Sequence, residues 1–360
     1  MKNINFDDLA KVIKSIPNNT HYWLVRTMGG DYYEEYIKNG YIAIGYNDIS
    51  LDEIKWAVAE KEKSIEKLKG LIEKKEIGRE TQNSNKDEEY NAQYASAQLM
   101  KFYKDINVGD YIVMPGIRSE KIAIAVVESG AYEEKKISKL TGMCNFGKRR
   151  KIKLIRQLVR TKMTPKMQLM FNSRHIISNV DGYAQYIDNC ISDFYIKEGL
   201  TYLVLRVKQE DDIPVDNFSV INDLMTLLNE YSYEKKVNAS SKDISMKIAV
   251  QSPGDIALIA ICGSLSLFLI GLFIVLIKGG DYEYRNKFLG SLKLHIPKSS
   301  EGIRTILESI SDFMDRTENR KRKALISEKL KNMDIDSPKD IENLLEETKK
   351  DIKHDSDENI

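Results

Sequence analysis

The chain has 360 residues, with 55 Lys and Arg against 54 Asp and Glu, so its formal net charge is +1. This length allows two domains, and the balanced charge excludes a field over the whole chain that would attract a polyanion. The three cysteines form no C-x-x-C pair and do not cluster with the four histidines. This pattern argues against both a zinc site and a disulfide framework.

Residues 6–128 alternate between short helices and strands. Apolar residues at helical spacing predict a helix over 6–16. Ser50 and Glu53 form a capping box that starts a second helix. Eight aromatic residues fall within 22–56; most of these rings should form core, and one or two could line a pocket where bases stack. Strands are predicted over 21–26, 41–46, 111–114 and 122–128, and a further helix over about 90–104.

Residues 135–180 contain thirteen Lys and Arg and no Asp or Glu. Such a segment produces a local positive field, which favours a nucleic-acid or phosphate-rich ligand. The alternatives are a surface near anionic lipid and a solvated face without a role. Ile152 and Leu154 alternate with Lys151 and Lys153, which predicts a strand. The candidate nucleic-acid-binding residues are Lys148, Arg149, Arg150, Lys151, Lys153 and Arg156.

Residues 181–250 predict a small α/β extension that ends in a polar linker. A helix is expected over 182–197, a strand over 201–207 and a second helix around 218–228.

Residues 256–277 carry no charge, and fifteen of these 22 residues are Ile, Leu, Phe or Val. As a helix the run would be about 33 Å long, enough to cross a hydrocarbon core of roughly 30 Å. We therefore expect one transmembrane helix over 254–278; the alternative is a helix buried in a large soluble core. The N-terminus lacks the apolar region of a signal peptide. This interpretation places the protein in the inner membrane, with its N-terminal region in the cytoplasm.

Residues 279–360 predict a charged helical tail. One of its helices carries an apolar stripe, formed by Ile303, Ile306, Leu307, Ile310, Phe313 and Met314. Such a stripe must be covered, which favours assembly into a homo-oligomer. Alternatively, a last helix that carries Ile341, Leu344 and Leu345 folds back over the stripe within one chain.

No catalytic motif is visible, because the chain has no G-x-S-x-G, no H-E-x-x-H and no P-loop. Acidic runs such as residues 210–212 are typical of an exposed turn. The missing motifs favour a protein that is not an enzyme but leave that question undecided, and we expect no cofactor or metal. A membrane-tethered nuclease with acidic residues dispersed along the sequence is a weaker alternative.

Three segments resemble the PUA/EVE-like module found at the N-terminus of Mrr-type restriction proteins and other bacterial defence proteins. They are residues 22–26 (YWLVR), 42–46 (IAIGY) and 108–115 (VGDYIVMP). The resemblance covers about residues 20–180. It implies an α+β fold with a mixed β-barrel, here with a helical insertion, that holds a flipped or modified base in a cage of aromatic and polar groups. Carried over by position, it places Trp23, Arg26, Gly45, Tyr46 and Pro115 near that pocket.

Four regions follow from these patterns. They are a PUA/EVE-like ligand-binding domain over 1–180, an extension over 181–250, a transmembrane helix over 254–278 and a charged tail over 279–360. We expect a membrane-anchored binding protein that senses a nucleic-acid feature or nucleotide in bacterial antiphage defence. The alternative is a cell-envelope scaffold without a nucleic-acid ligand.

Overall fold

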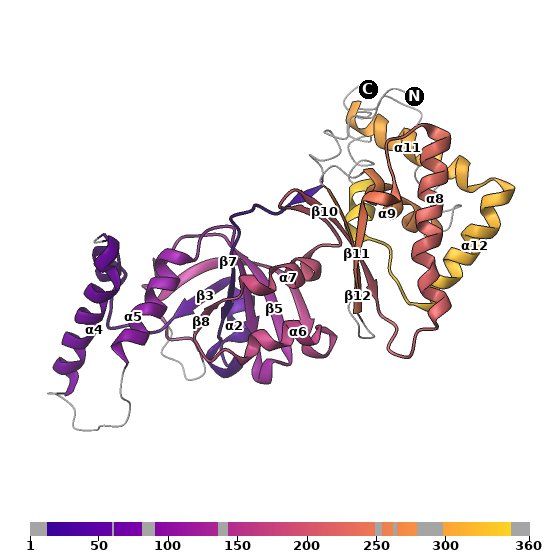
Figure 1. The fold of residues 1–360 in the computed structure, drawn as a ribbon. Helices are drawn as coiled ribbons and strands as arrows, with labels where there is room; N and C mark the ends of the chain where they lie inside the picture. The colour runs from indigo at the N-terminus through magenta and orange to yellow at the C-terminus, as the bar shows by residue number, and fades with distance from the viewer. Residues whose placement is uncertain are drawn as a thin grey trace, which may run out of the picture. The chain divides into compact units, whose positions relative to one another are not determined.

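The computed structural model describes residues 13–59, 61–80, 91–135, 143–248, 254–261, 265–278 and 298–346. It is an α+β protein that divides into two compact units, whose helices and strands are drawn in Figure 1. Unit 2 is the continuous segment Asn19–Ile191, and unit 1 combines Met1–Asn18 with Ser192–Ile360. Each unit has its own sheet.

Unit 2 is built on a curled, mixed half-barrel sheet. Its strands are β2 (Tyr22–Val25), β3 (Tyr41–Ile44), β4 (Tyr111–Pro115), β5 (Lys121–Val127), β6 (Tyr132–Glu133), β7 (Lys148–Val159) and β8 (Ile177–Asn179). Their order is β3-β7-β5-β4-β2-β8, with β6 beside β7. β2 runs parallel to β4, and the other described pairs are antiparallel. The β5–β7 register shifts between Ile124 and Ala125 and passes over Ile155, and such a bulge bends the strand.

Helices pack on both faces of this sheet. They are α2 (Tyr33–Asn39), α3 (Leu51–Val58), α4 (Ser64–Glu80), α5 (Ala92–Met100), α6 (Pro165–Gln168) and α7 (Ala184–Ile191), and a π-helical turn, Lys101–Asp105, follows α5. Alternate residues of a strand face opposite sides. Trp23 and Ile112 share a core with Ile54 of α3. On the opposite face, the Tyr22 hydroxyl donates a hydrogen bond to Asp188 of α7.

Side chains of α5 occupy the outer edge of β8. Gln98 Oε1 accepts the backbone N–H of Ile177 at 2.7 Å, and the Tyr94 hydroxyl accepts that of Ile176 at 3.0 Å. Lys101 donates to the Ile177 carbonyl oxygen at 3.3 Å. These contacts satisfy both backbone groups of Ile177, which a neighbouring strand would otherwise pair with, so the edge is covered at this residue.

Unit 1 has a five-stranded sheet in the order β1-β9-β10-β12-β11. The strands are β1 (Lys14–Ser15), β9 (Phe194–Lys197), β10 (Leu200–Val207), β11 (Ile244–Ile248) and β12 (Gly254–Ile261). The helices are α8 (Ser219–Lys235), α9 (Leu265–Lys278), α11 (Lys298–Met314) and α12 (Thr317–Asn332), followed by helical residues 339–346.

The expected transmembrane helix over 254–278 is wrong, because the charge-free run is not one helix. Its first part is β12, which pairs with β10 on one side and β11 on the other. Its second part is α9, with 14 residues. At 1.5 Å per residue α9 is about 21 Å long, shorter than a hydrocarbon core of roughly 30 Å. Among the described residues, no helix is both long and apolar enough to span a bilayer.

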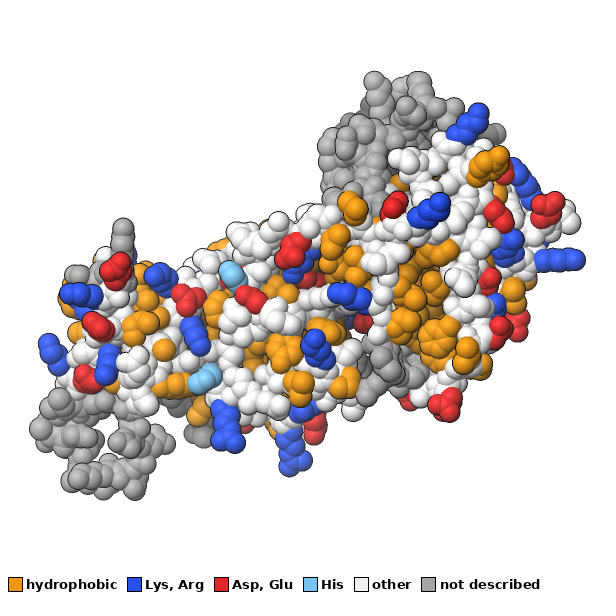
Figure 2. Space-filling model, in the orientation of Figure 1, with side chains coloured by type: hydrophobic (Ala, Val, Ile, Leu, Met, Phe, Trp, Pro, Cys, Tyr) orange, Lys and Arg blue, Asp and Glu red, His pale blue; other side chains and the backbone are white. Residues whose placement is uncertain are grey.

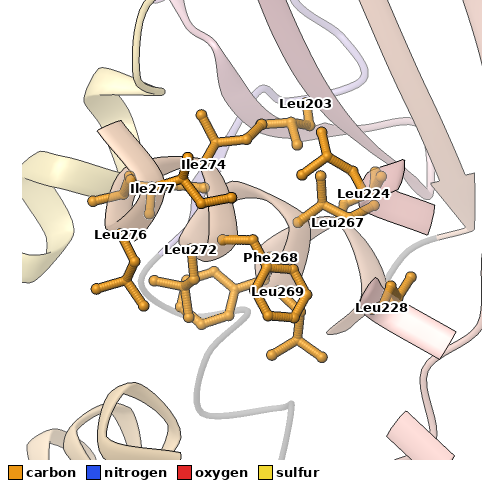
Figure 3. Close-up of a cluster of buried hydrophobic side chains, with 14 of the residues drawn as sticks. Leu203, Leu224, Leu228, Leu267, Phe268, Leu269, Leu272, Ile274, Leu276 and Ile277 are labelled. Carbon is orange, nitrogen blue, oxygen red and sulfur yellow. The ribbon is translucent and has the colours of Figure 1, made fainter. Parts of the chain in front are cut away.

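Residues 256–260 of β12 and 266–277 of α9 are all buried, which explains why this part of the run carries no charge. A strand with both faces covered is apolar along its whole length, and Ala257 and Leu258, on opposite faces of β12, are both buried. Figure 3 shows α9 in the core with Leu203 of β10 and with Leu224 and Leu228 of α8. Side chains all around α9 therefore have to be apolar.

The tail belongs to the same core. Its buried residues include Ile306, Leu307, Ile310, Phe313, Met314, Ile341, Leu344 and Leu345. Gly271 of α9 lies so close to Ile341 that a Cβ atom would stand 2.0 Å from the Ile341 Cδ1 atom. Asp340 fastens the last helix by accepting the backbone N–H groups of Asp193 and Phe194. The described part of the stripe is thus covered within the chain; the side chain of Ile303 lies outside the described residues.

Candidate nucleic-acid interface

The alternation of β7 divides its basic residues between the interior and the surface. Lys148, Arg150 and Ile152 are buried, with exposed fractions of 1%, 3% and 4%. Lys151, which lies between Arg150 and Ile152, and Lys153, which follows Ile152, are exposed. The acid-free segment is therefore not one basic face, and its inward-pointing cations have other roles.

Lys148 holds the turn that follows β3. Its Nζ atom donates to the carbonyl oxygens of Tyr46 at 2.9 Å and Ile49 at 2.8 Å. Burial lowers the pKa of Lys148 to about 8, because the ammonium group loses its hydration. Lys148 therefore fixes the backbone of Tyr46 from inside and is not available to a polyanion.

Arg150 closes the end of the α5 segment. Its Nε and Nη2 atoms donate to the carbonyl oxygens of Phe102 at 2.7 Å and Tyr103 at 2.8 Å, in the π-helical turn. Its Nη1 atom donates to the Ser129 carbonyl oxygen at 3.0 Å. The last carbonyl groups of a helix have no hydrogen-bond donor within the helix. Here the guanidinium group of Arg150 donates to two of them. Burial lowers the pKa of Arg150 to about 10. Its role is also structural.

The outward residues of the strand form what we call the outward stripe: Arg149, Lys151 and Lys153. Successive members are two residues apart, which corresponds to roughly 6–7 Å along a strand. The Arg149 guanidinium lies over the Tyr41 ring, 4.1 Å from its centre, and its Nε atom donates to the Phe146 carbonyl oxygen at 3.1 Å. One end of the stripe therefore adjoins the loop before β7.

Three aromatic side chains, Tyr32, Tyr46 and Phe146, are half-buried. We call them the aromatic patch, because Tyr32 contacts Phe146 and Tyr46 follows Gly45, which lies against Phe146. The rings of Tyr32 and Phe146 meet edge to face, with centres 5.3 Å apart. Gly45 lies against Phe146, since a Cβ atom on Gly45 would stand 3.2 Å from the Phe146 Cε1 atom. Tyr46 has a φ of +60°, which is uncommon for a bulky residue.

The loop before β7 is fastened from two sides. The Asn47 side chain donates to the Asn145 carbonyl oxygen at 2.8 Å and accepts the Gly147 N–H at 3.1 Å. Glu35 of α2 accepts the Cys144 N–H at 2.7 Å. Burial raises the pKa of the Cys144 thiol, which disfavours the reactive thiolate. The surroundings of the patch are thus built for rigidity and not for nucleophilic chemistry.

Trp23 serves the fold. It is 5% exposed, and its Nε1 atom donates to the Asp110 carboxylate at 2.9 Å. Asp110 also accepts the backbone N–H groups of His21 at 3.0 Å and Asn107 at 2.8 Å. These bonds join the starts of the parallel strands β2 and β4.

Three other predicted residues make backbone contacts that do not involve the rings of the aromatic patch. Arg26 donates to a backbone carbonyl just after α6 at 2.6 Å. The Pro115 carbonyl oxygen accepts the Thr27 hydroxyl at 2.5 Å. Arg156 donates to the Cys190 carbonyl oxygen of α7 at 2.6 Å. Of the residues that the resemblance places near a pocket, Gly45 lies against a ring of the patch, and Tyr46 follows it in the chain.

Sequence reasoning did not assign Tyr32 and Phe146 to a site. Tyr32 is one of the eight aromatic residues within 22–56, and this density of aromatic residues was the one signal that could have indicated it. Phe146 is distant from them in sequence, and the antiparallel pairing of β3 with β7 brings it beside Gly45.

No group of three or more His, Cys, Asp or Glu in the described ranges is placed to hold a metal ion. No protein-family model matches the chain, and no curated protein matches it either. A function is therefore inferred from the geometry of unit 2.

Proposed function

We propose that unit 2 binds nucleic acid, with a base against the aromatic patch and the phosphate backbone along the outward stripe. One observation carries this proposal. Tyr46 has a left-handed backbone conformation, and its carbonyl oxygen accepts a hydrogen bond from the buried ammonium group of Lys148.

This arrangement is unfavourable for folding on its own. A bulky residue in the left-handed region costs about 1–3 kcal/mol, and glycine at position 46 would remove that cost. A buried ammonium group also carries a desolvation penalty, as the lowered pKa of Lys148 indicates. The Tyr46 side chain packs against the core of unit 2 but is only half-buried, so part of it remains accessible at the surface. A ring held rigidly at the surface at such a cost supports contact with a ligand.

The chemistry of the neighbouring residues supports a nucleic-acid ligand. Aromatic side chains stack on bases with roughly 1–3 kcal/mol per base. Exposed lysines favour phosphates, whose binding releases counterions. Arg149 connects the two features, because its guanidinium packs on one tyrosine ring while it bonds to the loop of Phe146.

The fold supports a finer proposal. The curled mixed sheet is consistent with a PUA/EVE-like barrel, and the resemblance of residues 22–115 points to the same module. We therefore propose a flipped or modified base as the ligand, and bacterial antiphage defence as the setting. Membrane anchoring by residues 256–277 is not part of the proposal, because β12 and α9 lie in the core of unit 1.

The test is binding of the full chain to fluorescent single-stranded DNA and to matched duplexes with and without one methylated base, measured by polarisation. Tyr46→Gly keeps the left-handed backbone and the carbonyl acceptor of Lys148 but removes the ring. We expect it to weaken binding by roughly 5- to 100-fold, as removal of one stacking interaction predicts. Tyr233→Ala, at a tyrosine of α8 that is 90% exposed, is the control. Equal affinities of the Tyr46→Gly variant and the parent chain would contradict the proposal.

A further inference from the structure

β11 forms an open edge of the sheet in unit 1. It pairs with β12 on one side, and within the part of the chain that the structure describes, no strand pairs with its other side. All five of its residues are half-buried or exposed. The backbone N–H and C=O groups along such an edge can pair with a further strand.

The apolar residues of β11 lie on the side of the sheet that faces the helices, yet two of them, Met246 and Ile248, remain exposed. Met246 pairs with Leu258, a core residue of β12, so Ile244, Met246 and Ile248 share the core-facing side of the sheet. Met246 is nevertheless 46% exposed and Ile248 is 45% exposed. Figure 2 shows hydrophobic side chains gathered on the surface between the strands of unit 1 and α8. The sheet thus offers a strand edge and an apolar face at the same place.

We propose that β11 pairs antiparallel with β11 of a second copy of this chain, with the two Met246 residues facing each other across a two-fold axis. In this register Ile244 lies opposite Ile248 of the second copy, and Ser245 lies opposite Lys247. The three apolar positions of one strand then meet the three apolar positions of the other, on the core-facing side. Each Lys247 meets a serine and not another lysine.

Other registers fit less well. Centring the pair on Lys247 places two ammonium groups directly opposite each other, which is unfavourable. Shifting it by one residue turns the apolar side of one strand toward the polar side of the other. Centring it on Ser245 leaves Ile248 without an opposite apolar residue. The sequence of β11 is therefore self-complementary in one antiparallel register.

The pairing has a consequence for the whole assembly. Two five-stranded sheets become one continuous sheet, and closed two-fold symmetry leaves no further β11 edge for growth into a fibre. The proposal concerns unit 1 and does not depend on nucleic-acid binding by unit 2.

The first test is the mass of the full chain in solution, measured by light scattering after size-exclusion chromatography over a wide range of concentrations. We expect a dimer. Met246→Lys places two lysines opposite each other at the axis and should give a monomer with an unchanged circular dichroism spectrum. Tyr233→Lys adds the same charge at an exposed position of α8 and should remain dimeric.

The second test uses a cysteine in place of Met246, which avoids a large change of side-chain volume. Directly opposite residues of an antiparallel pair have Cβ atoms about 4.5–5.5 Å apart, near the separation that a disulfide needs. Met246→Cys should therefore form a covalent dimer under mild oxidation, whereas Ser245→Cys and the parent chain should not.

A monomeric parent chain at all concentrations would overturn the proposal, as would a dimer that survives Met246→Lys. Cross-linking through Ser245→Cys in place of Met246→Cys would overturn the register.

Discussion

The charge-free run of unit 1 has no charged residue and strand β7 of unit 2 has no acidic residue, and these two segments differ in how their side chains are placed. Residues 256–277 change from strand to helix, and both elements lie in one core. β7 remains one strand, and over residues 148–153 its buried side chains alternate with half-buried or exposed ones. The apolar run is buried over most of its length. The basic residues of β7, in contrast, lie in two environments, some buried and some at the surface.

The difference is a matter of solvation. An apolar side chain gains free energy in any buried position, so the run tolerates a change of secondary structure without a change of composition. A cation tolerates burial only when hydrogen bonds replace its hydration, and it still carries a desolvation penalty. Lys148 and Arg150 have such bonds to carbonyl oxygens. The strand period therefore determines which basic residues remain at the surface.

The largest effect should come from a charge in the charge-free run. Leu267→Arg buries an uncompensated guanidinium group at a position where the leucine side chain is fully buried, and we expect a loss of about 3–5 kcal/mol in unfolding free energy. Urea unfolding followed by circular dichroism measures this loss. Both tryptophans, Trp23 and Trp56, lie in unit 2, so their fluorescence transition should change much less. Tyr233→Arg, at an exposed site, is the control; an equal effect of both variants would contradict the buried position of α9.

The basic strand allows the same comparison between neighbours. Arg150→Met leaves three carbonyl oxygens without their donor. An orphaned buried acceptor costs about 1–3 kcal/mol, and of the three bonds only the one to Phe102 is fully buried, so we expect a loss of about 2–4 kcal/mol. Lys151→Met, one residue further and exposed, should change stability by about 0.5 kcal/mol or less. Urea unfolding followed by tryptophan fluorescence reports both. Similar losses for the two variants would refute the division of the strand into inward and outward positions.

Lys148 adds a dependence on pH. Its folded-state pKa of about 8 lies below the ordinary value near 10.5, so between these values the unfolded chain binds more protons than the folded chain. Stability from this group therefore rises as pH increases from 8 to 10.5. Relative to Lys148→Met, the parent chain should gain about 1–3 kcal/mol over this interval. The difference between the two urea midpoints, measured across the interval, tests the sign; a constant difference would rule out a depressed pKa.

The smallest effect on stability should come from the outward stripe. Replacing Lys151 and Lys153 by Ala should leave the urea midpoint nearly unchanged. Polyanion binding should nevertheless weaken. The slope of log affinity against log salt should become shallower by about 0.7 for each phosphate of a single strand that the variant no longer neutralises. Titrations at several salt concentrations measure that slope. An unchanged slope would remove the outward stripe from the proposed interface.

Local signals in the sequence predicted much of unit 2. Strands were expected over 21–26, 41–46, 111–114 and 122–128, and the structure places β2, β3, β4 and β5 there with small shifts at the ends. The capping box is also local, since Ser50 and Glu53 bond to each other across three residues. These features depend on alternation and on hydrogen bonds between near neighbours, which a sequence displays directly.

Where distant pairing decides the structure, the predictions were wrong. The helix expected over 6–16 ends, in its described part, as the strand β1, because Lys14 and Ser15 pair with β9. The helix expected over 182–197 stops as α7 at Ile191 and continues as β9. In both places a strand forms because a partner far along the chain supplies its hydrogen bonds, and no local pattern shows that partner.

The candidate site divides in the same way. Glycine next to an aromatic residue at 45–46 and the density of basic residues in β7 are properties of the sequence alone. The tertiary structure decided that Phe146 lies against Gly45, that Lys148 bonds to the carbonyl oxygen of Tyr46, and that Lys151 faces outward. Composition determines which groups need burial, hydration or a partner. The pairing of β7 with β3 and β5 determines which of its side chains are buried, hydrated or hydrogen-bonded, because strand register sets the side on which every side chain lies.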